Sequence, residues 1–94
     1  MKTTKQIWKF EIGASQSTIE VPRGAEILTV QTQNERACVW ALVDPANDKE
    51  IRNIEVFGTG HDINYEMGAN RKYIGTTQFR GGELVLHFFE RIYP

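Results

Sequence analysis

The sequence has 94 residues, 11 Lys and Arg against 12 Asp and Glu, a formal net charge of −1 and a single cysteine. This length predicts one domain over residues 1–94 and excludes a two-domain enzyme, and a hydrophobic content of 40% excludes a disordered chain. Neither half of the chain is basic, no apolar run is long enough for a membrane span, and a lone cysteine fits a reducing compartment. We therefore expect a cytoplasmic protein that binds neither duplex DNA nor a membrane.

Strand-forming residues dominate from the start of the chain, with 15 Ile and Val and eight Thr against four Leu. In residues 6–12 three apolar side chains alternate with charged ones, the pattern of a half-buried strand. Residues 17–21 and 26–33 alternate in the same way. The intervening Pro22-Arg23-Gly24 predicts a turn, so the simplest expectation is that these two strands form a hairpin.

Residues 37–43 form an uninterrupted apolar run, which predicts a strand buried on both faces or lying between the core and an interface, with Cys38 packed inside. Arg80-Gly81-Gly82 predicts a tight turn. The only segment that could form a helix, a short one, is residues 64–70. Three more runs with strand character complete a set of about seven: 51–57, 73–78 and 83–89. The fold class is all-β, a small antiparallel β-sandwich or barrel, and the sequence leaves that choice open.

The connection at residues 58–72 is the exception to short turns, because a 15-residue irregular loop is uncommon in a compact domain and such loops often bind ligands. Its glycines would let backbone amides approach an anion, and Arg71 and Lys72 would add positive charge. The alternative is an Ω-like loop whose glycines serve only backbone geometry. The loop residues expected to contact a phosphate or a ribose are Thr59, Gly60 and His61.

Catalytic and metal templates do not match. The glycines of the loop begin a Gly-x-Gly pattern without its third glycine or a phosphate-loop lysine, and no Gly-x-Ser-x-Gly sequence occurs. His61, Asp62 and Glu66 lack the spacing and the fourth ligand of a known metal site. His87 lies in an alternating apolar strand, so a hydrogen-bonded structural role is favoured over a catalytic base. We expect no catalytic residue, no metal and no cofactor.

Aromatic residues offer surfaces for stacking. Trp40 and Tyr73 are the candidates for contact with a planar base, and Tyr73 stands beside two cations, a combination suited to nucleotides. The alternative for Tyr73 is that it simply begins a strand. The aromatic residues expected in the core are Trp8, Phe10, Phe57, Phe88 and one face of Trp40.

Several segments of the chain resemble an uncharacterised family of short proteins encoded by bacteriophages and prophages. The segments that carry the resemblance are Ile-Trp-Lys-Phe at 7–10, Val-Pro-Arg-Gly-Ala at 21–25, Trp-Ala-Leu-Val-Asp-Pro at 40–45, Phe-Gly-Thr-Gly-His at 57–61, Tyr-Ile-Gly-Thr at 73–76 and Gly-Glu-Leu-Val-Leu-His at 82–87. The resemblance implies a small accessory protein that acts on host processes by binding and without catalysis.

In that context we expect a homo-oligomeric anti-defence protein in the host cytoplasm that sequesters a nucleotide-derived immune signal at a subunit boundary. The alternative is an inhibitor or adaptor that binds a host protein through the long loop or a sheet edge. The residues expected to bind the ligand are Trp40, Thr59, Gly60, His61, Arg71, Lys72, Tyr73, Thr76 and His87.

Overall fold

The computed structural model describes residues 4–13, 17–65 and 70–92, and seven strands account for most of them. The strands are β1 (Gln6–Ile12), β2 (Ser17–Pro22), β3 (Glu26–Gln33), β4 (Arg36–Val43), β5 (Lys49–Gly58), β6 (Asn70–Phe79) and β7 (Leu84–Ile92). One turn of 3₁₀ helix, η1 (Arg80–Gly82), joins the last two strands at the predicted turn. The predicted all-β fold is confirmed.

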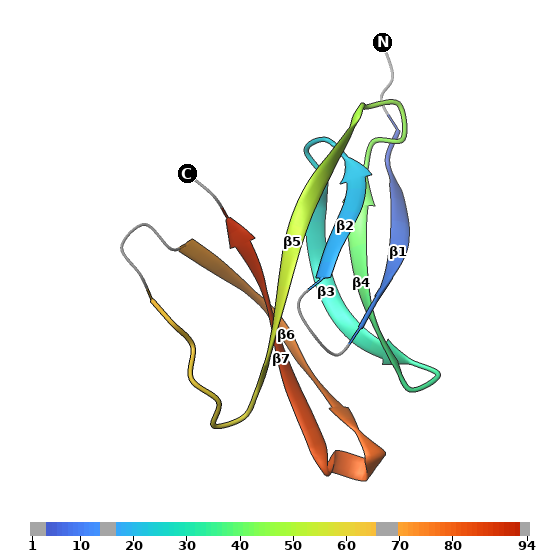
Figure 1. Ribbon diagram of the computed structural model, residues 1–94. Helices are drawn as coiled ribbons and strands as arrows, with labels where there is room; N and C mark the ends of the chain where they lie inside the picture. The colour runs from blue at the N-terminus through green and yellow to red at the C-terminus, as the bar shows by residue number, and fades with distance from the viewer. Residues whose placement is uncertain (1–3, 14–16, 66–69, 93–94) are drawn as a thin grey trace.

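The strands form two antiparallel sheets packed face to face (Figure 1). Sheet A has the order β1-β4-β3, and sheet B has the order β2-β5-β7-β6. The sheets do not close into a barrel, so of the two architectures that the sequence allowed the structure is the sandwich.

The core lies between the sheets because alternate residues of each strand point inward. Phe88 and Ile54 of sheet B are fully buried there. In β4 the odd-numbered apolar residues join the core, and the outward-facing Cys38 is also buried at 2% exposure, as predicted. Trp8 and Phe10 pack against the core from β1. The core residues are Ile12, Ile19, Val21, Ala25, Val30, Ala37, Val39, Ala41, Val43, Ile54, Leu86 and Phe88.

The predicted hairpin between the second and third strands is wrong. β2 pairs with β5 and β3 pairs with β4, so the turn at Arg23 carries the chain from sheet B to sheet A. Val21 and Ala25 are buried on either side of this turn. The Arg23 backbone N–H donates to the carbonyl of Asp48 at 2.6 Å, which ties the turn to the β4–β5 connection. Alternation identifies a strand and Pro22-Arg23-Gly24 identifies a turn, but neither pattern shows which strand pairs with which.

The connection after β5 is shorter than predicted. β5 continues to Gly58 and β6 begins at Asn70, so Arg71 and Lys72 are strand residues. The expected helical potential at 64–70 is not realised at Asn64, Tyr65 or Asn70, and residues 66–69 lie outside the described part of the chain. The end of β5 and the start of β6 are both lengthened because β7 supplies a ladder partner to each, Leu86 to Gly58 and Ile92 to Asn70.

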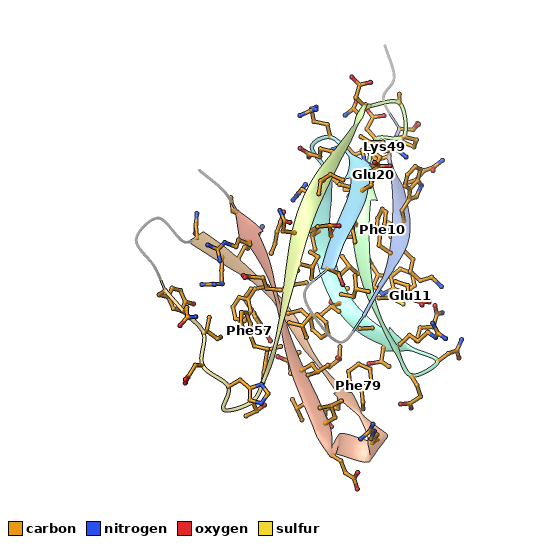
Figure 2. All side chains as sticks on the ribbon, viewed as in Figure 1. Phe10, Glu11, Glu20, Lys49, Phe57 and Phe79 are labelled. Carbon is orange, nitrogen blue, oxygen red and sulfur yellow. The ribbon has the colours of Figure 1, made fainter. Side chains whose placement is uncertain are left out.

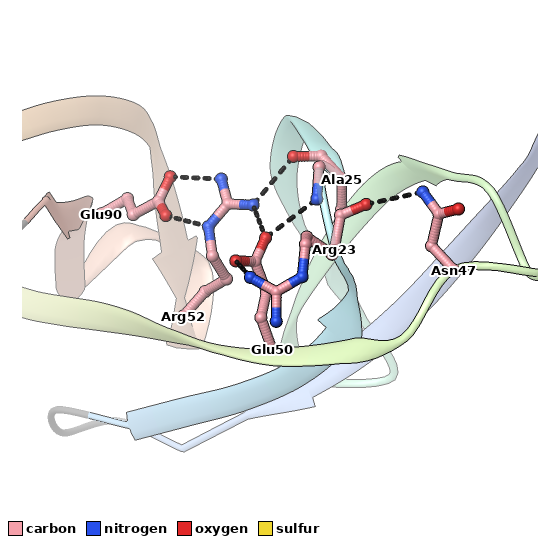
Figure 3. Close-up of polar contacts among 7 residues, drawn as sticks. Arg23, Ala25, Asn47, Glu50, Arg52 and Glu90 are labelled. Carbon is pink, nitrogen blue, oxygen red and sulfur yellow. Dashed lines mark hydrogen bonds and ion pairs between the residues drawn. The ribbon is translucent and has the colours of Figure 1, made fainter.

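A charged network fastens sheet B to the turn between β2 and β3 (Figure 3). The Arg52 guanidinium donates to both carboxylate oxygens of Glu90 and, at 2.9 Å, to the carbonyl of Ala25. The Glu50 carboxylate accepts from the Gly24 backbone N–H at 2.9 Å. Glu90 is buried and Arg52 is half-buried, and the hydrogen bond that Arg52 donates to the Glu90 carboxylate is the main cause of a raised pKa at Arg52.

The two sheets approach closely along one edge, where β3 of sheet A runs beside β6 of sheet B. A Cβ atom placed on Gly75 of β6 would lie 2.9 Å from Cγ1 of Val30 in β3, closer than packed side chains allow. Gly75 therefore permits the close approach of the two backbones, and the outer faces of the sheets meet along this β3–β6 seam.

Candidate functional site

A chain of hydrogen bonds crosses the outer face of sheet B near this seam. The Tyr73 hydroxyl bonds to the Thr76 hydroxyl, Thr76 Oγ1 lies 2.9 Å from Nδ1 of His87, and Nε2 of His87 lies 2.6 Å from the Thr59 hydroxyl. The ladder of β6 with β7 places Tyr73, Thr76 and His87 on one face. These four residues were all expected in the site, and they meet within one copy of the chain.

His87 is positioned by a hydroxyl at each ring nitrogen. A neutral imidazole offers one donor and one acceptor, and each threonine hydroxyl can serve either role. The side chain is only partly buried. The hydrogen-bonded histidine that the sequence favoured is therefore what the geometry of His87, Thr59 and Thr76 provides.

The turn after β5 explains the glycines of the loop. The His61 backbone N–H donates to the Gly58 carbonyl at 3.1 Å, and Gly60 has φ of +86°, a conformation that favours glycine. A Cβ on Gly58 would lie 2.8 Å from Cε1 of the His61 ring. Gly60 thus meets a need of backbone geometry, the alternative that the sequence left open, whereas Gly58 leaves room for the His61 ring. The same turn places Thr59 against His87 and leaves His61 exposed.

Arg71 is buried on the outer face of sheet B, where it pairs with the Glu55 carboxylate. Glu55 was not identified as a site residue from the sequence. Arg71 donates from Nε to Glu55 Oε1 at 2.6 Å and from Nη1 to the Asn64 carbonyl at 2.7 Å, and its side chain is 4% exposed. The guanidinium lies 5.7 Å from the ring centroid of Phe57 and 5.1 Å from that of Tyr65. Arg71 therefore fastens the segment after β5 onto the sheet, which differs from the expected role of meeting a ligand phosphate.

Phe57 and Lys72 also lie elsewhere than the sequence suggested. Phe57 is outside the core: it projects from β5 on the side away from sheet A (Figure 2) and packs edge-on against Phe89. Lys72 pairs with Glu90 in the β6–β7 ladder, whereas Tyr73 pairs with Phe89. Because successive strand residues face opposite sides, Lys72 and Tyr73 lie on opposite faces of sheet B.

Trp40 lies on sheet A, and open depressions connect it to the seam. One of about 310 Å³ is lined by Trp40 with residues of β3, and another of about 340 Å³ reaches Thr76. The two share Gln31 and Thr32. We call the continuous strip of Trp40, Gln31, Thr32, Thr76, Tyr73, His87 and Thr59 the seam surface.

The cation at the Trp40 end of the seam surface is Lys9 of β1. Its ammonium lies 5.8 Å from the Trp40 ring centroid and donates to the Gln33 side chain. The Trp40 indole nitrogen is buried and has no hydrogen-bond partner among the described residues. The ring face of Trp40, and not its N–H group, is therefore what a ligand would meet.

Three residues at or near the seam surface, Gln31, Thr32 and Glu55, were not identified from the sequence. Gln31 and Thr32 fall in an ordinary alternating strand and become candidates only because β3 borders β6. Glu55 lies on β5 and accepts a hydrogen bond from Arg71 of β6. The two residues meet because β7 lies between β5 and β6 in sheet B, which the sequence does not reveal. The sequence carries no signal for this pair, because β5 also contains Lys49, Glu50, Arg52 and Asn53 and an acidic residue does not stand out among them.

Metal and membrane features can be stated for the described residues. No group of three or more His, Cys, Asp or Glu side chains converges there as metal ligands would. His61 and Asp62 are both exposed, and Glu66 lies outside the described residues. Within the same ranges, no helix has the length and apolar character needed to cross a membrane.

Comparison with known proteins identifies a family without an assigned activity. A family model described as a domain of unknown function, DUF7352, matches residues 3–94. Neither the curated proteins nor the solved structures contain a match to the chain. The match spans nearly the whole sequence, and the chain therefore belongs to the DUF7352 family.

Proposed function

We propose that this chain binds a nucleotide-derived molecule on the seam surface and holds it without chemical turnover. The observation that supports the proposal is the placement of two aromatic rings, Trp40 and Tyr73, along one strip of neutral hydrogen-bonding side chains. Tyr73 is 55% exposed, so much of its ring is available for contact.

The chemistry of the strip matches the parts of a nucleotide. A base can stack on the Trp40 face, a contact worth about 1–3 kcal/mol. The Gln31 amide and the hydroxyls of Thr32 and Thr76 both donate and accept hydrogen bonds, as ribose hydroxyls and base edges require. Lys9 brings a positive charge beside Trp40 for a phosphate group.

A homo-oligomer is part of this proposal because the depressions along the strip are open. Tightly held small ligands have about 70–90% of their surface buried, and a shallow strip on one copy leaves more of the ligand in solvent. A second copy that covers the strip would complete the enclosure. Retention without turnover suits sequestration of a nucleotide-derived immune signal in a host cytoplasm, the anti-defence role that the phage resemblance implied.

The first test is titration calorimetry of the full chain with ADP-ribose and with a panel of cyclic dinucleotides. At least one should bind, and Thr76→Val should weaken its binding by about tenfold, equivalent to about 1.4 kcal/mol. Thr18→Val is the matched control, because Thr18 is an exposed strand threonine on β2, away from the strip. Absence of heat with every compound, or equal effects of the two variants, would refute the proposal.

Turnover is tested on the same samples. After prolonged incubation with the protein, the bound nucleotide should be recovered unchanged by chromatography. Recovery of a hydrolysis product would contradict binding without catalysis, and His61→Ala would then be the first variant to examine, since His61 is the exposed histidine of the adjacent turn.

The second candidate is an inhibitor or adaptor that binds a host protein, and the edge of sheet A favours it. β1 is an outer strand of that sheet, and its Ile7 is 60% exposed. An outer strand can accept a strand from another protein. Affinity capture from host lysate separates the two functions, because a nucleotide-sequestering protein should recover no stoichiometric protein partner.

A further inference from the structure

We propose that one end of the sandwich binds an uncharged, largely apolar small molecule, at a site separate from the seam surface. A cavity of about 480 Å³ opens there between the end of β1, the start of β4 and the β6–β7 hairpin. This volume falls in the range of roughly 300–1,000 Å³ that is typical of small-molecule sites.

The walls of the cavity are apolar and come from both sheets. Ile12 and Ala37 line it from sheet A, and Phe79, Leu84 and Leu86 line it from sheet B. Ile12, Ala37 and Leu86 are core residues, so this part of the wall is held by the packing of the sandwich. Phe79 lies between the hairpin and sheet A (Figure 2). The cavity therefore offers a preformed apolar surface.

The rim of the cavity determines the charge of the ligand. It carries Glu11, Glu35, Arg36 and Arg80, two residues of each sign. Glu11 and Arg36 already pair at 2.6 Å. Glu35 and Arg80 lie in the β3–β4 turn and in η1, at the tips of two hairpins, each with a positive φ, of 62° and 53°. An anionic or cationic head group attracted to one of them would be repelled by the other, so the balanced rim favours a neutral ligand.

The probe for this site is N-phenyl-1-naphthylamine, a neutral apolar dye whose fluorescence rises in apolar surroundings. With the full chain we expect a saturable increase with a Kd below about 100 μM. Decan-1-ol should displace the dye at least about fivefold more effectively than decanoate or decylamine. Absence of saturable binding by the folded protein, or stronger displacement by either charged compound, would overturn the proposal.

The position of the site is tested by filling it. Ala37→Leu places a larger side chain in the wall and should abolish dye binding, whereas Ala46→Leu, in the exposed turn between β4 and β5, should leave it unchanged. If Ala37→Leu does not fold, methyl NMR of the unaltered chain decides. Shifts at Ile12 and Leu84 on dye addition support the site, and shifts confined to residues beside Trp40 refute it.

Discussion

The close approach of β3 and β6 can be tested by a single methyl group. A Cβ on Gly75 would lie 2.9 Å from Cγ1 of Val30, which is 4% exposed and β-branched, so it has little freedom to move aside. Overpacking of this kind costs about 1–3 kcal/mol. The φ of Gly75 is outside the left-handed region, so alanine by itself would stabilise the strand by roughly 0.5–1 kcal/mol. We expect a net loss of about 1 kcal/mol for Gly75→Ala, a decrease of several degrees in Tm.

A double-mutant cycle assigns that loss to the seam. Val30→Ala should cost about 2 kcal/mol by itself, from two lost methyl groups and the space they leave. Combined with Gly75→Ala it should cost at least about 1 kcal/mol less than the sum, because the truncated side chain makes room for the new methyl group. Urea unfolding measures all variants, with Gly13→Ala, which meets no atom within 4 Å, as the control. If Gly75→Ala is as stable as Gly13→Ala, or the two costs add, the seam is not packed as described.

Four further outcomes follow from burial, backbone geometry and charge. Phe88→Ala, at a fully buried site, should cost about 3–5 kcal/mol in urea unfolding, and a loss below about 1 kcal/mol would contradict its central place in the core. Gly60→Ala should cost about 1–2 kcal/mol because φ is +86°, and an unchanged Tm would rule out that turn. Glu55→Gln should cost about 3–5 kcal/mol because it leaves the buried Arg71 guanidinium without its carboxylate, and a neutral effect would show that the pair is exposed. For Arg52 the folded-state pKa is raised, so its stabilisation is complete below the unfolded-state pKa and is lost only as pH rises through the folded value, both far above neutral. Arg52→Ala should therefore destabilise equally at about pH 6 and about pH 9, and a loss confined to the lower pH would contradict this account.

The strands were predictable from the sequence because each one is a local pattern. The run at 26–33 coincides with β3, and the run at 6–12 coincides with β1. Period-two alternation records which side chains face the core, and that requirement is the same whichever strand lies alongside. The burial of Cys38 was predictable from a different local pattern, the uninterrupted apolar run at 37–43.

The candidate site was predictable only in part. Thr59, Tyr73, Thr76 and His87 were all singled out, and the structure joins them by hydrogen bonds. Their grouping could not be derived, since it depends on β7 lying between β5 and β6. Arg71 was also singled out, as a loop cation that would meet a ligand phosphate. In the structure it lies in β6 and donates a hydrogen bond to Glu55, a pairing that depends on the strand order.

The sequence alone determined that this protein is all-β with about seven strands, because hydrophobic alternation and turn residues act over a few positions. Only the tertiary structure decided which strands pair, and hence that β2 joins sheet B and that β3 borders β6 across Gly75. Pairing depends on how two complete sheets share one core, a requirement that no local segment encodes. The seam surface and the end cavity arise from those pairings, and so they appear only in the folded chain.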